Sequence, residues 1–223
     1  MLFSRHRHPC LSATMTVAIM LAIAAPSLAD TNSSSSPFPG LELVNVKGID
    51  RLYRRPDVDA SVYSKILIGE PVVEFSKNWR PSNYGRFGIS AQQLKKIRVD
   101  LAALAKTTFA KVLGEGGYEI VTTAGDDTLE ITPNIAELYI NAPDVPSAGR
   151  TRTYTMEAGA ATLVLTVSDA VTGTLLAVAY DRERSQSLTM QWSTSVSNRA
   201  AAADMLKSWA GQVKRELDAA RAK

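Results

Sequence analysis

The chain has 223 residues and a formal net charge of +3, and its two histidines (His6 and His8) and its single cysteine (Cys10) all lie within the first ten residues. The rest of the chain has no imidazole and no thiol, so it cannot hold a Ser-His-Asp triad, a cysteine nucleophile, a His-ligated zinc or a c-type haem. A chain of this length suits one domain with a proper hydrophobic core.

The first 29 residues have the three-part layout of a secretory signal. Arg5 and Arg7 give a positive start, residues 11–25 are largely apolar, and small residues follow. A membrane-spanning helix needs roughly 20 apolar residues, and this stretch is shorter. We therefore expect cleavage between Ala29 and Asp30, with an uncleaved N-terminal anchor as the alternative.

Removal of this segment leaves 194 residues (223 − 29) with a formal charge of +1, because 23 basic and 22 acidic residues remain. A nearly neutral domain argues against bulk binding of nucleic acid. An exported domain without disulfides fits a bacterial periplasm, which is the expected location. Cys10 precedes the apolar stretch, so anchoring through an acylated cysteine is not expected, and no later segment is apolar enough to span a bilayer.

Residues 30–40 (DTNSSSSPFPG) predict a flexible leader, and residues 41–223 are expected to form the folded domain. Residues 63–75 are β-branched and apolar and predict a single strand. Pro71 lies at its middle, and since proline cannot donate to a ladder, the strand is expected at a sheet edge or at a bulge.

Ser90 and Gln93 form a capping box that predicts the start of an amphipathic helix of about 23 residues. Gly114 is expected to end this helix. A second amphipathic helix is expected near the C-terminus, capped by Ser197 or Asn198.

Several strands are expected between the two helices, at residues 118–123, 128–132, 135–141, 162–168 and 174–181. Pro133 is expected to break the second of these strands from the third. The connection between the last two opens with Asp169 and closes with Gly173, which predicts a hairpin. The order of elements predicts an α+β fold: a single-domain, two-layer sandwich of a mainly antiparallel sheet with two long amphipathic helices on one face.

Carboxylates are the main chemical groups that remain for catalysis, because a glycosidase needs only two of them. Six glutamates lie in or beside predicted strands, and we interpret them as pointing to solvent: Glu70, Glu74, Glu119, Glu130, Glu137 and Glu157. The pairs Asp57/Asp59 and Asp126/Asp127 offer oxygen ligands for calcium. Neither has the length or the glycine of a dedicated loop, so ordinary turns are expected. We assign no catalytic residue, metal site or cofactor.

A possible binding patch would form if the segments that hold several arginines and aromatic residues meet in space: Arg51, Arg54, Arg55, Trp79, Arg80, Tyr84 and Arg86. Arginine beside aromatic rings suits anionic lipid headgroups, glycan carboxylates or a partner protein. The alternative is that Arg54 and Arg55 pair with Asp57 and Asp59.

The run RLYRRPDVDASVYSKILIGEPVVEF, the later TLEITPNIAELYINAPD, the hairpin LVLTVSDAVTGTLLAVAYDR and the closing LKSWAGQVKRELD together resemble an exported bacterial family catalogued as domain of unknown function 3313. The resemblance implies an envelope protein with no assigned activity and no transferable catalytic residues. Many relatives resemble lipoproteins, and this chain differs from them because it has no suitably placed cysteine.

Three functions remain open. We expect an exported, non-enzymatic binding or structural protein of the bacterial envelope, with an envelope protein or an anionic envelope component as its partner. A carrier of a small apolar ligand, held between helices and sheet, is one alternative. A carboxylate-based hydrolase of cell-wall material is the other, and it would need two acids that converge in a cleft. The sequence does not indicate the oligomeric state.

Overall fold

The computed structural model describes residues 36–80, 89–140, 154–192 and 195–222, with the backbone alone at 154–158, 185–192 and 195–198. Within these residues the strands are β1 (Glu42–Val44), β2 (Arg51–Arg54), β3 (Lys65–Ile68), β4 (Val73–Phe75), β5 (Glu119–Val121), β6 (Thr128–Ile140), β7 (Tyr154–Asp169) and β8 (Leu175–Trp192). The helices are α1 (Ala91–Glu115), α2 (Ser195–Arg221) and the short 3-10 helix η1 (Ala60–Val62).

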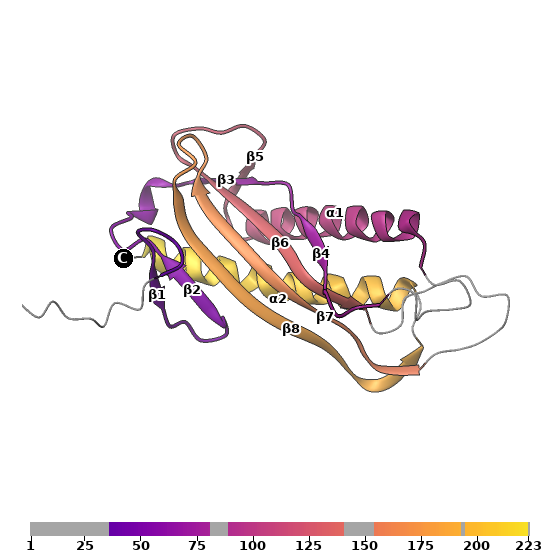
Figure 1. Cartoon of the computed structure of the whole chain (residues 1–223). Helices are drawn as coiled ribbons and strands as arrows, with labels where there is room; N and C mark the ends of the chain where they lie inside the picture. Colours follow the sequence, from indigo (N-terminus) through magenta and orange to yellow (C-terminus); the bar gives the residue numbers. More distant parts are fainter. Residues whose placement is uncertain (1–35, 81–88, 141–153, 193–194, 223) are drawn as a thin grey trace, which may run out of the picture. The chain divides into compact units, whose positions relative to one another are not determined.

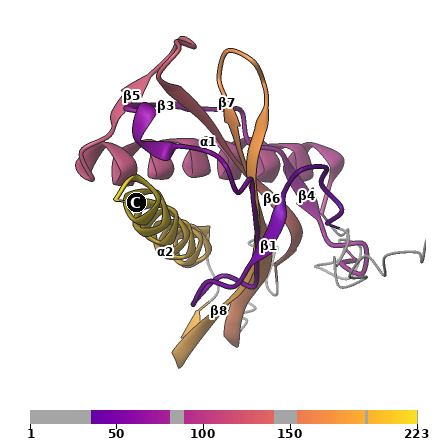
Figure 2. The ribbon, with the colours of Figure 1, turned by 90° about the vertical axis from the view of Figure 1, so that its left-hand side faces the viewer.

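All eight of these strands belong to one mixed sheet, in the order β1-β2-β8-β7-β6-β3-β5, with β4 also paired to β6. Successive pairs from β1 through β2, β8 and β7 to β6 are antiparallel. Strands β3 and β4 pair with β6 in parallel, and β5 pairs with β3 in parallel. In the view of Figure 1 both helices lie behind the strands, and Figure 2 shows α2 nearly end-on beside the sheet. The predicted α+β class is confirmed.

The hydrophobic core lies between the sheet and the two helices. Phe109 of α1 and Trp209 of α2 are 0% and 1% exposed, and burial of a side chain of this size contributes about 1.5–3 kcal/mol. They belong to one cluster with alternate residues of the central strands, among them Ile131, Leu163, Leu165 and Val167. Side chains alternate between the two faces of a strand, so this cluster identifies the face of the sheet that the helices cover.

Helix α1 begins where the capping box predicts. The Ser90 hydroxyl accepts a hydrogen bond from the Gln93 amide at 3.2 Å, and the Gln93 side chain accepts one from the Ser90 amide at 2.8 Å. The helix ends at Glu115, one residue beyond Gly114, and Gly117 follows with φ +94°. The second helix begins at Ser195, two residues before Ser197.

The prediction of one strand over residues 63–75 is wrong in detail. The chain forms two short strands, β3 and β4, separated by residues 69–72. Both pair with the same strand, β6, along its successive halves. Pro71 lies in the gap between them, so its missing amide hydrogen interrupts no ladder.

The prediction that Pro133 breaks its strand is also wrong, because β6 runs without interruption. The carbonyl of Ile131 accepts from the Gly69 amide, and the amide of Ile135 donates to the Val72 carbonyl. Backbone groups of every second residue point to the same side of a strand, so the nitrogen of Pro133 points toward the gap between β3 and β4. No described strand pairs with β6 there, so the missing amide hydrogen of proline breaks no hydrogen bond.

The predicted hairpin is confirmed as the turn between β7 and β8. One carboxylate oxygen of Asp169 accepts hydrogen bonds from the amides of Val171 and Thr172 at 3.1 and 2.7 Å. Gly173 has φ +67°, a conformation that glycine adopts without strain. The strands themselves are longer than predicted, at 16 and 18 residues.

Candidate functional site on the outer face of the sheet

The face of the sheet opposite the helices carries no described helix, and we call it the outer face. It is identified by alternation: Leu163 and Leu165 of β7 belong to the core, so the residues between and beside them point the other way. The pairing of β6, β7 and β8 then places the following side chains on the outer face: Thr132, Asn134, Thr162, Val164, Thr166, Val178, Tyr180 and Arg182.

The centre of the outer face has little charge. Asn134, Val164 and Tyr180 lie side by side across three strands, and all three are half-buried by their neighbours in the sheet. Thr132, Thr166 and Val178 form the adjacent row, and none of them carries a charge. Val178 is 1% exposed, so the face is covered at this position. Depletion of charged groups is the feature that distinguishes the core of a protein interface from the rest of a surface.

A charged group borders this centre on one side. Glu137 forms an ion pair with Arg182 and accepts a hydrogen bond from the Thr162 hydroxyl at 3.0 Å. The Arg182 guanidinium also donates to that hydroxyl at 3.3 Å. Because the two charges neutralise each other on the surface, the group adds a directional polar contact without a net charge.

The backbone at Glu137 has φ +52°, and it is the only described residue other than glycine with a positive φ. The ladder between β6 and β7 shifts register between Ala136 and Tyr139, which marks a β-bulge. A left-handed conformation costs a residue with a Cβ atom about 1–2 kcal/mol. The bulge turns the Glu137 carboxylate toward Arg182 on β8.

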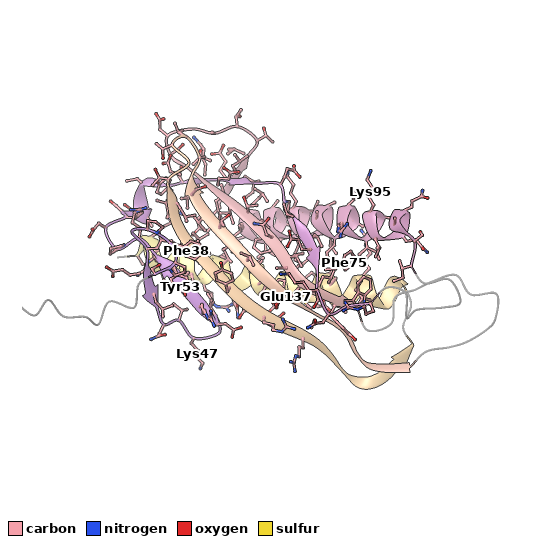
Figure 3. The ribbon with its side chains drawn as sticks, in the orientation of Figure 1. Phe38, Lys47, Tyr53, Phe75, Lys95 and Glu137 are labelled. Carbon is pink, nitrogen blue, oxygen red and sulfur yellow. The ribbon has the colours of Figure 1, made fainter. Side chains whose placement is uncertain are left out.

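Three aromatic rings gather on the side of the outer face toward β2, and one of them is Tyr180 of the centre. The rings of Phe38 and Tyr53 meet edge to face at a centroid distance of 5.4 Å, and Phe38 also stacks on Tyr180 at 6.3 Å. Phe38 precedes the first strand, so the chain that leads into the sheet already lies on this face. Figure 3 shows Phe38 and Tyr53 at one end, with Glu137 between them and Phe75.

A second aromatic group lies at the β4 edge. Phe75 stacks on Trp79 with centroids 4.6 Å apart, and the Arg98 guanidinium of α1 lies 5.0 Å from the Phe75 centroid. Trp79 is 4% exposed, and its indole nitrogen donates to the Ile140 carbonyl at 3.0 Å. This group fastens the segment after β4 to the sheet and to α1.

The structure divides the predicted arginine–aromatic patch. Arg51 and Arg54 lie in β2, whereas Trp79 follows β4, and the three strands β8, β7 and β6 separate β2 from β4. Arg55 donates to the Leu175 carbonyl at 3.2 Å, and Arg80 donates to the Lys77 carbonyl at 2.6 Å. Tyr84, Arg86, Ala29 and Asp30 lie outside the described residues.

The alternative pairing of these arginines with Asp57 and Asp59 does not occur in the described part of the chain. Asp59 instead accepts from the amide and hydroxyl of Ser61 at the start of η1. Asp127 binds Ser64 and Lys65. No group of three or more acidic, histidine or cysteine side chains suited to a metal is found where side chains are described.

Two tyrosine–carboxylate contacts tie distant segments together. The Tyr63 hydroxyl donates to Asp169 at 3.0 Å, and the Tyr118 hydroxyl donates to Asp218 at 2.8 Å. Burial raises the pKa of both phenols, and the neighbouring carboxylates raise it further. The amide and hydroxyl hydrogen bonds of Thr172 lower the pKa of Asp169. The phenols therefore stay protonated as donors, which is a structural role.

The glutamates considered for hydrolysis lie mostly at the surface where they are described. Glu70, Glu74, Glu119 and Glu137 are exposed and Glu130 is half-buried. Glu70 pairs with Lys106 of α1 and Glu137 pairs with Arg182, while the side chain of Glu157 lies outside the described residues.

A family model described as "Protein of unknown function (DUF3313)" matches residues 40–213 of the chain. The comparison of this chain with curated proteins found no match. Neither α1 nor α2 contains, over its described residues, a stretch apolar and long enough to cross a membrane.

Three solved structures illustrate the structural comparisons. Protein XCC0632 from Xanthomonas campestris, of family DUF330, has a TM-score of 0.42 at 11% identity, covering 72% of this chain and 86% of that one. A PelC dodecamer from Paraburkholderia phytofirmans has a TM-score of 0.34 at 8% identity, covering 70% and 95%. A DUF4136 family protein from Bacteroides thetaiotaomicron has a TM-score of 0.33 at 9% identity, covering 79% and 98%. Likeness at this level does not indicate a shared function.

Proposed function

The chain belongs to the DUF3313 family, and we propose that it is an exported, non-enzymatic binding protein of the bacterial cell envelope that contacts a partner protein through its outer face. The observation that carries the proposal is the weakly charged centre of that face, formed by Asn134, Val164, Tyr180 and their neighbours. It lies between an aromatic group and a neutralised ion pair.

The composition of the face favours a protein over an ion or a small polar ligand. Tyrosine and arginine are enriched where proteins meet, and charged groups are depleted from the centre of such contacts. Tyr53 and Tyr180 offer partly exposed rings, and Arg182 is held in place by Glu137 and Thr162. Fixed side chains lose less conformational entropy on binding.

Export and a periplasmic location are part of the proposal. The positive start, the apolar stretch and the small residues before Asp30 support them. Mass spectrometry of the protein recovered from a periplasmic fraction tests this part directly. We expect a mature form that begins at Asp30, and recovery of only the full-length chain from the cytoplasm would contradict export.

Photo-crosslinking tests the surface. Benzoylphenylalanine placed at position 180 on the outer face should capture one envelope protein, whereas the same group at position 99, which is exposed on α1, should not. The substitution Thr166→Arg at the centre of the face should abolish the crosslink. The matched control Thr107→Arg, at an exposed position of α1, should leave it intact.

Two results would reject the surface as the binding site. One is a product from position 99 equal to that from position 180. The other is a product that persists in Thr166→Arg. A small apolar ligand found in native mass spectra of the purified protein would instead favour the carrier alternative.

A further inference from the structure

Asp181 is a carboxylate buried at the junction of three elements. It lies on the helix-covered side of β8 and is 8% exposed. The indole nitrogen of Trp209 on α2 donates to one of its oxygens at 2.8 Å, and the Asp50 amide donates to the other at 3.3 Å. A single side chain therefore connects α2, β8 and the segment that leads into β2.

Asp50 also makes a second hydrogen bond to β8. Its carboxylate accepts the backbone amide of Arg182 at 3.0 Å, next to the last ladder pair between β2 and β8, Arg51 and Tyr180. Asp50 and β8 thus exchange two hydrogen bonds where the ladder ends, and Asp181 takes part in both the sheet edge and the helix contact.

A third carboxylate follows two residues along the same face of β8. Glu183 accepts a hydrogen bond from the Ser208 hydroxyl at 2.9 Å, so Ser208 and Trp209 of α2 each bind one acid. Asp50, Asp181 and Glu183 form no ion pair in the described part of the chain. We call these three residues the acidic junction.

The elements packed around the junction supply no compensating cation among the described side chains. On β7 the residues opposite Asp181 and Glu183 are Leu163 and Ala161, which do not titrate. On α2 the charged residues before Ser208 are Arg199, which is exposed, and Asp204 and Lys207, which pair with each other at 4.0 Å. The segment before β2 contributes another acid, Asp50, and one cation, Lys47, which forms no ion pair in the described part of the chain.

We propose that the acidic junction is a pH-dependent clamp, in which proton binding to Asp181 and Glu183 tightens the attachment of α2 to the sheet and proton loss loosens it. Protonation removes the repulsion among three neighbouring carboxylates, and the buried acid then no longer carries a charge. The contacts from Trp209 and Ser208 turn that local change into a change in how firmly the helix is held.

The pKa values of Asp181 and Glu183 are both shifted in the direction that the clamp requires. Burial raises the pKa of Asp181, and the charge of Asp50 adds to the effect, while the Trp209 and Asp50 hydrogen bonds oppose it. Burial likewise raises the pKa of Glu183, with a contribution from Asp181. An acid whose pKa is raised in the folded state lowers the stability of that state as the pH rises from the unfolded pKa, and the loss is complete above the raised pKa. The penalty disappears as the pH falls below the ordinary pKa of the unfolded chain.

Hydrogen exchange of the α2 amides across a pH series tests the clamp, after correction for the intrinsic pH dependence of exchange. Protection of α2 should fall as the pH rises above about 4, the ordinary value for an unfolded carboxyl group, by up to tenfold for each unit of pKa elevation, while α1 in the same sample serves as the internal reference. The variant Asp181→Asn keeps an oxygen for the Trp209 hydrogen bond and should remove most of the fall. Glu183→Gln should remove part of it.

The matched control is Asp204→Asn, which removes an exposed acid from α2 and should leave the fall unchanged. If α2 protection is equal at all pH values, or if it falls as steeply in both Asp181→Asn and Glu183→Gln as in the natural sequence, the clamp is rejected. A uniform loss of protection in Asp181→Asn with an unchanged slope would show a purely structural role. None of these results depends on the partner proposed for the outer face.

Discussion

The hydroxyl of Tyr63 donates a hydrogen bond to Asp169 at 3.0 Å, across 106 residues of sequence. Tyr63 follows η1, whereas Asp169 is the last residue of β7 and also organises the turn to β8. This contact joins the early part of the chain to the tip of the hairpin.

The substitution Tyr63→Phe should therefore lower the free energy of unfolding by about 0.5–1.5 kcal/mol, because it removes one hydrogen bond and keeps the buried ring. Asp169→Ala should cost more, since it also removes the bonds that order the turn. Urea denaturation measures both. Equal effects of the two substitutions would contradict the double role of Asp169.

The variant Glu137→Gly should be more stable than Glu137→Ala, which is the reverse of the order expected in an ordinary strand. In an ordinary strand alanine is preferred, but the φ of +52° at Glu137 favours glycine by about 1 kcal/mol. Both variants lose the contacts to Arg182 and Thr162 equally, so their difference isolates the backbone. Denaturation midpoints that place alanine above glycine would show that the bulge does not persist in solution.

The substitution Pro133→Ala should lower the free energy of unfolding by about 1–2 kcal/mol, because it removes part of a fully buried ring opposite Leu165 although it breaks no ladder hydrogen bond. The contrasting variant is Ile135→Pro, which removes the amide that donates to Val72. It should cost about 3 kcal/mol or more, because it also replaces a core isoleucine that is 2% exposed. Thermal unfolding compares the two, and a loss in Pro133→Ala as large as that in Ile135→Pro would contradict the account of how β6 accommodates proline at position 133.

The folded chain should be most stable at mildly acidic pH, since two groups of carboxylates act in opposite directions. The Ser64 and Lys65 hydrogen bonds lower the pKa of Asp127, and Lys214 and Tyr118 lower that of Asp218. Acids of this kind contribute stability that is present above their unfolded pKa and lost as the pH falls through their folded pKa. The raised pKa values of Asp181 and Glu183 have the opposite effect, so their penalty grows toward neutral pH.

Unfolding curves from about pH 3 to pH 8 would show this maximum. Asp127→Asn should weaken the loss on the acid side alone. A stability that rises steadily up to neutral pH would contradict the contribution assigned to Asp181 and Glu183.

The arginines in and directly after β2 are still proposed to bind an anionic envelope component. The double substitution of Arg54→Ser and Arg55→Ser should release the protein from envelope fractions, although Arg55 also loses its bond to the Leu175 carbonyl. A control that replaces Lys77 and Lys95, both exposed, by serine removes the same charge elsewhere. Equal fractionation of the two variants would discard the idea.

Elements specified by local chemistry were the ones that the sequence predicted well. The capping box at Ser90 and the turn from Asp169 to Gly173 depend on residues a few positions apart, and both form as expected. The continuity of β6 through Pro133 could not be predicted in this way. It depends on the gap between two partner strands some 60 residues earlier in the chain.

The candidate site was harder to predict because it depends on sheet order. The sequence places Arg51 and Trp79 less than 30 residues apart, yet three strands from later in the chain separate them. Side chains alternate between the two faces along the predicted strands at residues 162–168 and 174–181. This alternation indicates that Thr162 and Thr166 share one face, and that Tyr180 shares a face with every second residue of its own strand. Arg182, at the end of that alternation, could have been found by continuing it by one residue.

The position of β2 beside β8 has a consequence for the order in which the chain can fold. Arg51 pairs with Tyr180, a separation of 129 residues (180 − 51), and contacts of such long range form slowly. During synthesis β1 and β2 leave the ribosome well before their partner exists, so this part of the sheet closes only when nearly the whole chain is available.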